Sequence, residues 1–98
     1  MHAEVQNLFI RIQLLHLAQD QNLTVSDTLP MLEKRGYRIA EREIRQQLDY
    51  LTQENFLTSH GEQWSLTGAG IEEFKEISAM LHRVNDEVLA SGSKASAT

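Results

Sequence analysis

The sequence has no cysteine, a single proline and an aromatic fraction of only 6% among its 98 residues. Without cysteine, disulfides, thiol nucleophiles and thiolate metal sites are excluded, so stability has to come from packing or from a partner subunit. No apolar run approaches the ~20 residues that cross a bilayer. The N-terminus also lacks the basic flank, apolar stretch and cleavage site of a secretory signal. We therefore expect a cytoplasmic protein that has no membrane partner.

The length and composition indicate one folded domain. A chain of 98 residues falls at the lower edge of the roughly 100–200 residues that make up a typical domain. Its hydrophobic fraction of 41% and charged fraction of 23% are ordinary for a globular protein. We expect a single domain over residues 1–90, followed by a disordered tail of small residues over 91–98.

Basic residues are scarce but clustered. The net charge is -5, yet five of the nine Lys and Arg residues lie between positions 34 and 45, where only Glu41 and Glu43 oppose them. Outside this segment, four basic residues face twelve acidic ones (9 − 5 and 14 − 2). The pattern predicts a local basic patch on an acidic body, so any contact with DNA should centre on this segment.

Two helices are predicted before the basic segment. Apolar residues over 4–19 recur at helical spacing on two sides, which predicts a helix buried on both sides, with the second apolar face meeting another chain. A short second helix should begin after a cap at Thr24 or Ser26 and end at Gly36. Pro30 is expected to be tolerated only near the first turn of that helix.

A third helix is predicted over residues 40–53, and its two faces differ in chemistry. At 100° per residue, one face carries Ile44, Leu48 and Leu51. The opposite face, with Arg45 at its margin, carries Arg42, Gln46, Asp49 and Gln53. One face should therefore pack against the core while the other meets solvent or a ligand.

A hairpin and a long helix complete the predicted order. Asn55 suits a left-handed helix cap, and two short strands over 56–59 and 63–66 should form a hairpin. Thr67 is a suitable N-cap for a fourth helix over about 68–89. The sequence thus predicts a mainly α fold with a small β-hairpin, in the order α-α-α-β-β-α.

The fourth helix carries an apolar stripe that predicts self-association. Its apolar residues are spaced by three or four, as in a coiled-coil seam, but only the first half of the helix can reach the core. Exposed apolar patches of this kind usually mark interfaces. We expect a homodimer whose interface contains Leu8, Ile12, Leu15, Phe74, Ile77, Leu81, Val84 and Val88. The alternative is that the stripe folds back over the first helix within one chain.

The third helix and the hairpin resemble a known family. Leu48, Leu51 and Phe56-Leu57 follow a pattern L-x-x-L-x-x-x-G-L, and Leu66-Thr67-Gly68-Ala69-Gly70 follows L-T-x-x-G. Both occur in the winged helix-turn-helix regulators of bacteria and archaea of the ArsR, MarR and PadR type, which residues 5–89 resemble. The chain departs from them in two ways. Asn55 replaces the usual glycine, and the hairpin tip over 60–62 has no Arg or Lys.

The resemblance implies a homodimeric, sequence-specific transcriptional regulator that binds double-stranded DNA. Its third helix would lie in the major groove, with Arg42, Arg45 and Gln46 contacting bases. Flanking contacts to phosphates would come from Lys34, Arg35 and Arg38. The alternative is that these charges belong to a solvated helix face, and Asp49 on that face counts against DNA. In that case the protein is a non-catalytic adaptor that binds another protein.

The sequence gives no indication of an enzyme. It contains no combination of nucleophile, base and orienting group, and no glycine loop with a phosphate-binding lysine. His82 and Asp86 share a helical face where some ArsR-type sensors bind metal, but the ligand pattern of those sensors is not reproduced. We expect no metal, no cofactor and no catalytic residue, with His16 at an interface and Trp64 in the core or anchoring the hairpin.

Overall fold

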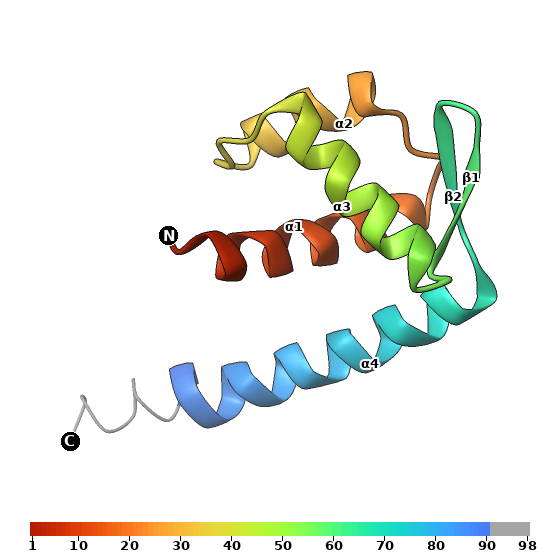
Figure 1. Cartoon of the computed structure of the whole chain (residues 1–98). Coiled ribbons are helices and arrows are strands. Elements are labelled where there is room, and N and C mark those ends of the chain that lie inside the picture. The colour runs from red at the N-terminus through yellow and green to blue at the C-terminus, as the bar shows by residue number, and fades with distance from the viewer. Residues whose placement is uncertain (91–98) are drawn as a thin grey trace.

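The computed structural model describes residues 1–90, and these residues are mainly helical (Figure 1). The helices are α1 (Ala3–Ala18), α2 (Val25–Lys34), α3 (Glu41–Gln53) and α4 (Gly68–Val84), and a π-helix, η1 (Asn85–Ala90), follows α4. An antiparallel hairpin of β1 (Leu57–His60) and β2 (Gln63–Leu66) lies between α3 and α4. This order confirms the predicted fold class and agrees with the winged-helix pattern. The tail predicted over 91–98 lies outside the described residues.

The core lies between α1, α2 and α3. The fully enclosed side chains come from all three helices, and they include Ile10, Leu14, Leu32, Ile44 and Leu48, each with no exposed surface. One of the two apolar faces of α1 is thus used within the chain. The other face is enclosed toward the end of the helix, at Leu15, and open toward its start, where Val5, Leu8 and Phe9 are between 37% and 48% exposed.

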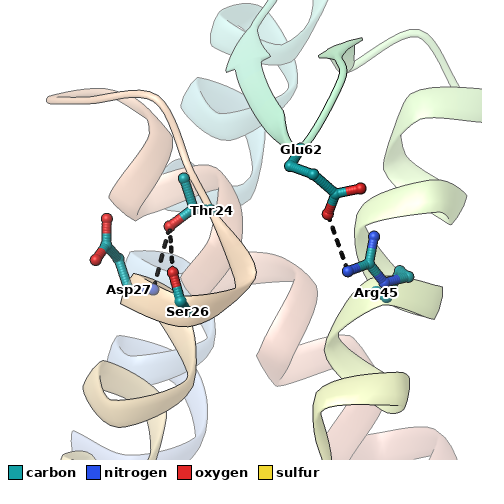
Figure 2. Close-up of polar contacts among 5 residues, drawn as sticks. All are labelled: Thr24, Ser26, Asp27, Arg45 and Glu62. Atoms are coloured by element: carbon teal, nitrogen blue, oxygen red, sulfur yellow. Dashed lines mark hydrogen bonds and ion pairs between the residues drawn. The ribbon is translucent and has the colours of Figure 1, made fainter.

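The second helix begins and ends at residues that the sequence indicates, but its proline lies elsewhere than expected. The Thr24 hydroxyl caps α2 by accepting a hydrogen bond from the Asp27 amide at 3.1 Å (Figure 2). Gly36, with φ +94°, follows the last turn. Pro30 was expected only near the first turn, yet it is the sixth residue of α2. Because Pro30 is exposed, its ring faces solvent, and α2 continues to Lys34 without the one backbone bond that proline cannot donate.

The hairpin is held to the rest of the domain through β2. Leu57 pairs with Leu66 and His60 with Gln63, and the intervening turn uses Gly61 at φ +65°. On its other edge, β2 forms a bridge to the segment between α1 and α2, where the Leu23 and Trp64 backbones exchange two hydrogen bonds of 2.7 and 2.9 Å. The sequence did not predict this bridge, which fixes the hairpin to the rest of the domain.

The junction into α4 depends on close packing. Asn55 adopts the predicted left-handed conformation, with φ +66°. The Thr67 hydroxyl donates to the Asn55 carbonyl at 2.6 Å and accepts from the Gly70 amide at 3.0 Å, which confirms Thr67 as the N-cap. A Cβ atom on Gly70 would lie 2.2 Å from the Phe56 carbonyl oxygen, so only glycine fits there.

The fourth helix ends differently from the prediction. One α-helix was expected over 68–89, but α-helical geometry stops at Val84 and η1 continues as a π-helix to Ala90. Figure 1 shows α4 running beneath α1, separated from α2 and the hairpin tip. Its first turns adjoin the core, whereas its C-terminal half extends past it.

Candidate nucleic-acid interface

Helix α3 is anchored by one face and presents the other. Ile44 and Leu48 are fully buried, whereas Arg42, Gln46 and Asp49 are exposed, as the periodicity predicted. At its start, the Glu43 carboxylate accepts a hydrogen bond from the Ala40 amide at 2.9 Å. The exposed face of α3 is therefore held at a fixed orientation relative to the core.

The two arginines of α3 are in different environments. Arg42 is exposed and forms no hydrogen bond or ion pair within residues 1–90. Arg45 has an ion pair with Glu62 of the hairpin turn, with 3.0 Å between Nη2 and Oε2 (Figure 2). The guanidinium carbon of Arg45 also lies 5.9 Å from the centre of the Trp64 ring. Arg42 is free to meet a ligand, whereas Arg45 already has a partner.

Glu62 lies near this face and was not predicted as a site residue. The hairpin tip lacks Lys and Arg, and its acidic residue beside Gly61 had no predicted role. The order of elements could have indicated this role, because a hairpin that directly follows α3 can bring its turn back toward the same helix. An acidic residue in that turn is then a candidate partner for any arginine on the neighbouring helix margin.

The other basic residues surround the turn between α2 and α3. In Figure 1 this turn and the hairpin lie on opposite sides of α3, so the predicted basic segment forms two groups. Lys34 and the Arg38 guanidinium are without a hydrogen-bonding partner among the described residues. Arg35 donates a hydrogen bond to the Gln13 side chain of α1, and the Arg38 carbonyl accepts from Gln6 at 3.5 Å. The structure thus leaves Lys34, Arg38 and Arg42 available to a polyanion.

A flank of α3 is tied to α1 through polar contacts that the sequence did not predict. Arg11 donates a hydrogen bond to Gln47 at 2.9 Å, and its guanidinium carbon lies 4.5 Å from the centre of the Tyr50 ring. Gln47 is 8% exposed, so this bond satisfies a polar side chain at the edge of the core. The contact reinforces the position of α3.

An apolar groove lies on the opposite part of the domain, between α1 and α4. It has a volume of about 320 Å³, and its apolar lining consists of Leu8, Ile12, Ile77, Met80, Leu81 and Val84. Glu73 and Glu76 line it as well. Leu81 and Val84 are 44% and 45% exposed.

The predicted interface residues fall into three groups. Leu8, Leu81, Val84 and Val88 are exposed, and Ile12, Phe74 and Ile77 are half-buried. Leu15, by contrast, is 2% exposed and belongs to the chain's own core. Met80, which is exposed and lines the same groove, was missing from the prediction.

The histidines and acidic residues do not gather into a further site. The His16 ring stacks on Phe74 with 5.9 Å between the ring centres, so it joins α1 to α4. Across residues 1–90, no three His, Asp or Glu side chains are grouped so that they could hold a metal ion. Within the same residues, no helix is both long enough and apolar enough to cross a membrane.

The fold is similar to that of a solved bacterial protein. The structure of a transcriptional regulator from Clostridium thermocellum matches this chain with a TM-score of 0.64, covering 90% of this chain and 98% of that one. The two sequences are 18% identical, so the likeness concerns the fold. No protein-family model matches the sequence, and no curated protein matches it.

Proposed function

We propose that this protein is a DNA-binding transcriptional regulator without catalytic activity that places α3 in the major groove of double-stranded DNA. This proposal rests on the exposed face of α3. Arg42 has no partner there within residues 1–90, Gln46 lies one turn further along, and the other face of the helix is buried. Arg can bond guanine O6 and N7, and Gln can bond adenine N6 and N7. The regulatory role of the protein from Clostridium thermocellum, which has the same fold, supports this assignment.

Phosphate contacts would come from the turn between α2 and α3. Lys34 and Arg38 are exposed there and adjoin the start of α3. Such contacts fix the register of a protein on the duplex without reading its sequence. Arg35 can contribute only by leaving Gln13, with which it is hydrogen-bonded. The neutral and acidic hairpin tip would stay out of the minor groove.

The active form is proposed to be a homodimer. Leu81 and Val84 line the groove between α1 and α4, and Val88 is exposed one turn further along the chain. We assign the groove to a second copy of the chain, because the stripe on α4 has the spacing of a self-complementary helical seam. A twofold pairing through α4 leaves both α3 helices free, and regulators of this kind place them about one DNA turn, ~34 Å, apart.

The test is titration of a pool of random-sequence duplex DNA by fluorescence anisotropy at low and moderate salt. The wild type should bind with an affinity that falls steeply with salt, because lysine and arginine release counterions from the phosphates. Arg42→Ala/Arg45→Ala should lose at least about tenfold in affinity and reduce the slope of log affinity against log salt by about one ion contact, that of Arg42, because Arg45 is already paired with Glu62. The matched control, Lys75→Ala/Arg83→Ala, removes the same charge from α4 and should bind as the wild type does.

A second candidate is an adaptor that binds another protein. The observation that favours it is the acidic character near α3, where Asp49 is exposed and Glu62 has already paired with Arg45. A folded dimer that binds no duplex at low salt would reject the regulator and leave the adaptor. Equal losses in the Arg variant and in the α4 control would also reject the assigned DNA face.

A further inference from the structure

The ion pair between Arg45 and Glu62 joins the proposed DNA-reading helix to the hairpin turn. Its two atoms are 3.0 Å apart, and the side chains of Arg45 and Glu62 are 41% and 78% exposed. Figure 2 shows the Glu62 carboxylate directed at the Arg45 guanidinium across the space between the hairpin and α3. A negative charge therefore stands at the margin of the surface assigned to DNA.

The position of Glu62 is set by the hairpin, which is held to the rest of the domain. Trp64 exchanges two backbone hydrogen bonds with Leu23, and the Gln63 side chain accepts a hydrogen bond from Asn22 at 3.4 Å. Gly61, with φ +65°, allows the tight turn that joins the two strands, and this turn fixes the backbone position of Glu62. The carboxylate is thus presented to α3 by a fixed scaffold.

We propose that Glu62 is a positioning residue that restrains DNA binding by holding Arg45 as a counter-ion. This inference rests on the proposed function, because it concerns the same surface. With Glu62 in place, the Arg45 charge is neutralised and its guanidinium is turned toward the hairpin. DNA has to replace the carboxylate before Arg45 can contact a base or a phosphate, and the carboxylate itself repels the phosphates.

The expected effect follows from counterion release. Each cation that contacts a phosphate of duplex DNA contributes about 0.9 to the slope of log affinity against log salt. One such contact therefore raises affinity about eightfold at 0.1 M salt relative to 1 M salt. Glu62→Gln keeps the size of the side chain and frees Arg45. It should raise affinity for random-sequence duplex by about five- to tenfold near 0.1 M salt and steepen the slope by about one contact.

A matched control is available on α4. Glu72 pairs with Lys75 at 3.3 Å, and these side chains are 72% and 68% exposed. Glu72→Gln changes net charge equally and also breaks an exposed ion pair, but one within α4 and not between α3 and the hairpin. It should leave DNA affinity and salt slope within error of the wild type. Equal gains in both variants would overturn the proposal, since net charge alone would then explain them.

A double variant tests whether Glu62 acts through Arg45. In an Arg45→Ala background, Glu62→Gln should no longer steepen the salt slope, because no arginine is released. If the slope steepens as much as before, Glu62 acts only by repelling phosphate and its role in positioning Arg45 is wrong. A loss of affinity in Glu62→Gln alone would also overturn the proposal, because Glu62 would then orient Arg45 for DNA.

Fluorescence reports on the ion pair without DNA. Trp64 is the single tryptophan of the chain, and the Arg45 guanidinium lies over its ring. Trp64 emission should change in Glu62→Gln and stay constant in Glu72→Gln. Both variants should keep the urea midpoint of the wild type, as is usual for exposed positions. Unchanged emission in Glu62→Gln would show that Arg45 does not depend on Glu62.

The outcomes separate this inference from the proposed function. If Arg42→Ala/Arg45→Ala abolishes binding but Glu62→Gln gains none, the regulator stands and the role of Glu62 falls. If the wild type binds and Glu62→Gln binds more tightly with a steeper salt slope, both proposals are supported. If neither protein binds duplex at low salt, both proposals fail.

Discussion

The region before α4 buries most of its apolar residues, whereas α4 leaves most of its own partly or fully exposed. Every buried apolar side chain of residues 1–90 lies at or before Trp64. In α4, by contrast, Gly70 is the one buried residue, and η1 has none among its six. Yet both parts have apolar residues at helical spacing, so spacing alone does not decide which residues form the core.

The difference shows which part of the sequence specifies the monomer. Helices α1–α3 and the hairpin enclose one another, so their apolar side chains leave water when a single chain folds. Helix α4 touches this core through half-buried residues such as Phe74 and Ile77, but within residues 1–90 its end stays exposed from Met80 onward. Residues 3–66 should therefore set the stability of the monomer, whereas the end of α4 should set its association.

The largest effect is expected in the first region. Leu14→Ala removes a side chain with no exposed surface from the centre of α1. Lost apolar burial and the residual cavity should lower the free energy of unfolding by about 2–5 kcal/mol. Urea unfolding followed by Trp64 fluorescence measures this loss. Val88→Ala, at a position 60% exposed, is the contrasting change and should cost under about 0.5 kcal/mol at a concentration where the chain is monomeric.

A smaller effect, specific to association, is expected at α4. Leu81→Glu/Val84→Glu puts two charges on the apolar surface, so the dimer dissociation constant should rise at least about tenfold, or 1.4 kcal/mol. Sedimentation velocity over a range of concentrations measures it. Monomer stability should hardly change, because both positions are exposed in one chain. A wild type that is monomeric at every concentration would mean that the surface binds something other than a second copy.

Much of the fold could be predicted from local signals. Four element ends were marked by residues suited to them. The side chains of Thr24 and Thr67 cap helices, and the backbones of Gly36 and Asn55 have a positive φ. Other features depend on tertiary context. The Leu23–Trp64 bridge joins residues far apart in sequence, and no local pattern indicates it.

The site was predictable only in outline. Periodicity placed Arg42 and Gln46 on the exposed face of α3, because that face follows from the buried one. Periodicity says nothing of contacts between elements, so the pairing of Arg45 with Glu62 was not foreseen. Likewise, Leu15 shares a stripe with Leu8 and Ile12, yet the approach of α3 and α4 encloses it whereas Leu8 stays 48% exposed.

The smallest predicted effect concerns the joint between the two regions. Thr67 binds the end of α3 and the start of α4 together, through the Asn55 carbonyl at 2.6 Å and the Gly70 amide at 3.0 Å. Thr67→Ala loses the cap and should lower the free energy of unfolding by about 1 kcal/mol. Thr67→Ser keeps the hydroxyl and should cost less. If the two variants cost the same in urea unfolding, methyl packing rather than the cap would stabilise the joint, and α4 would be attached to the core by apolar contact alone.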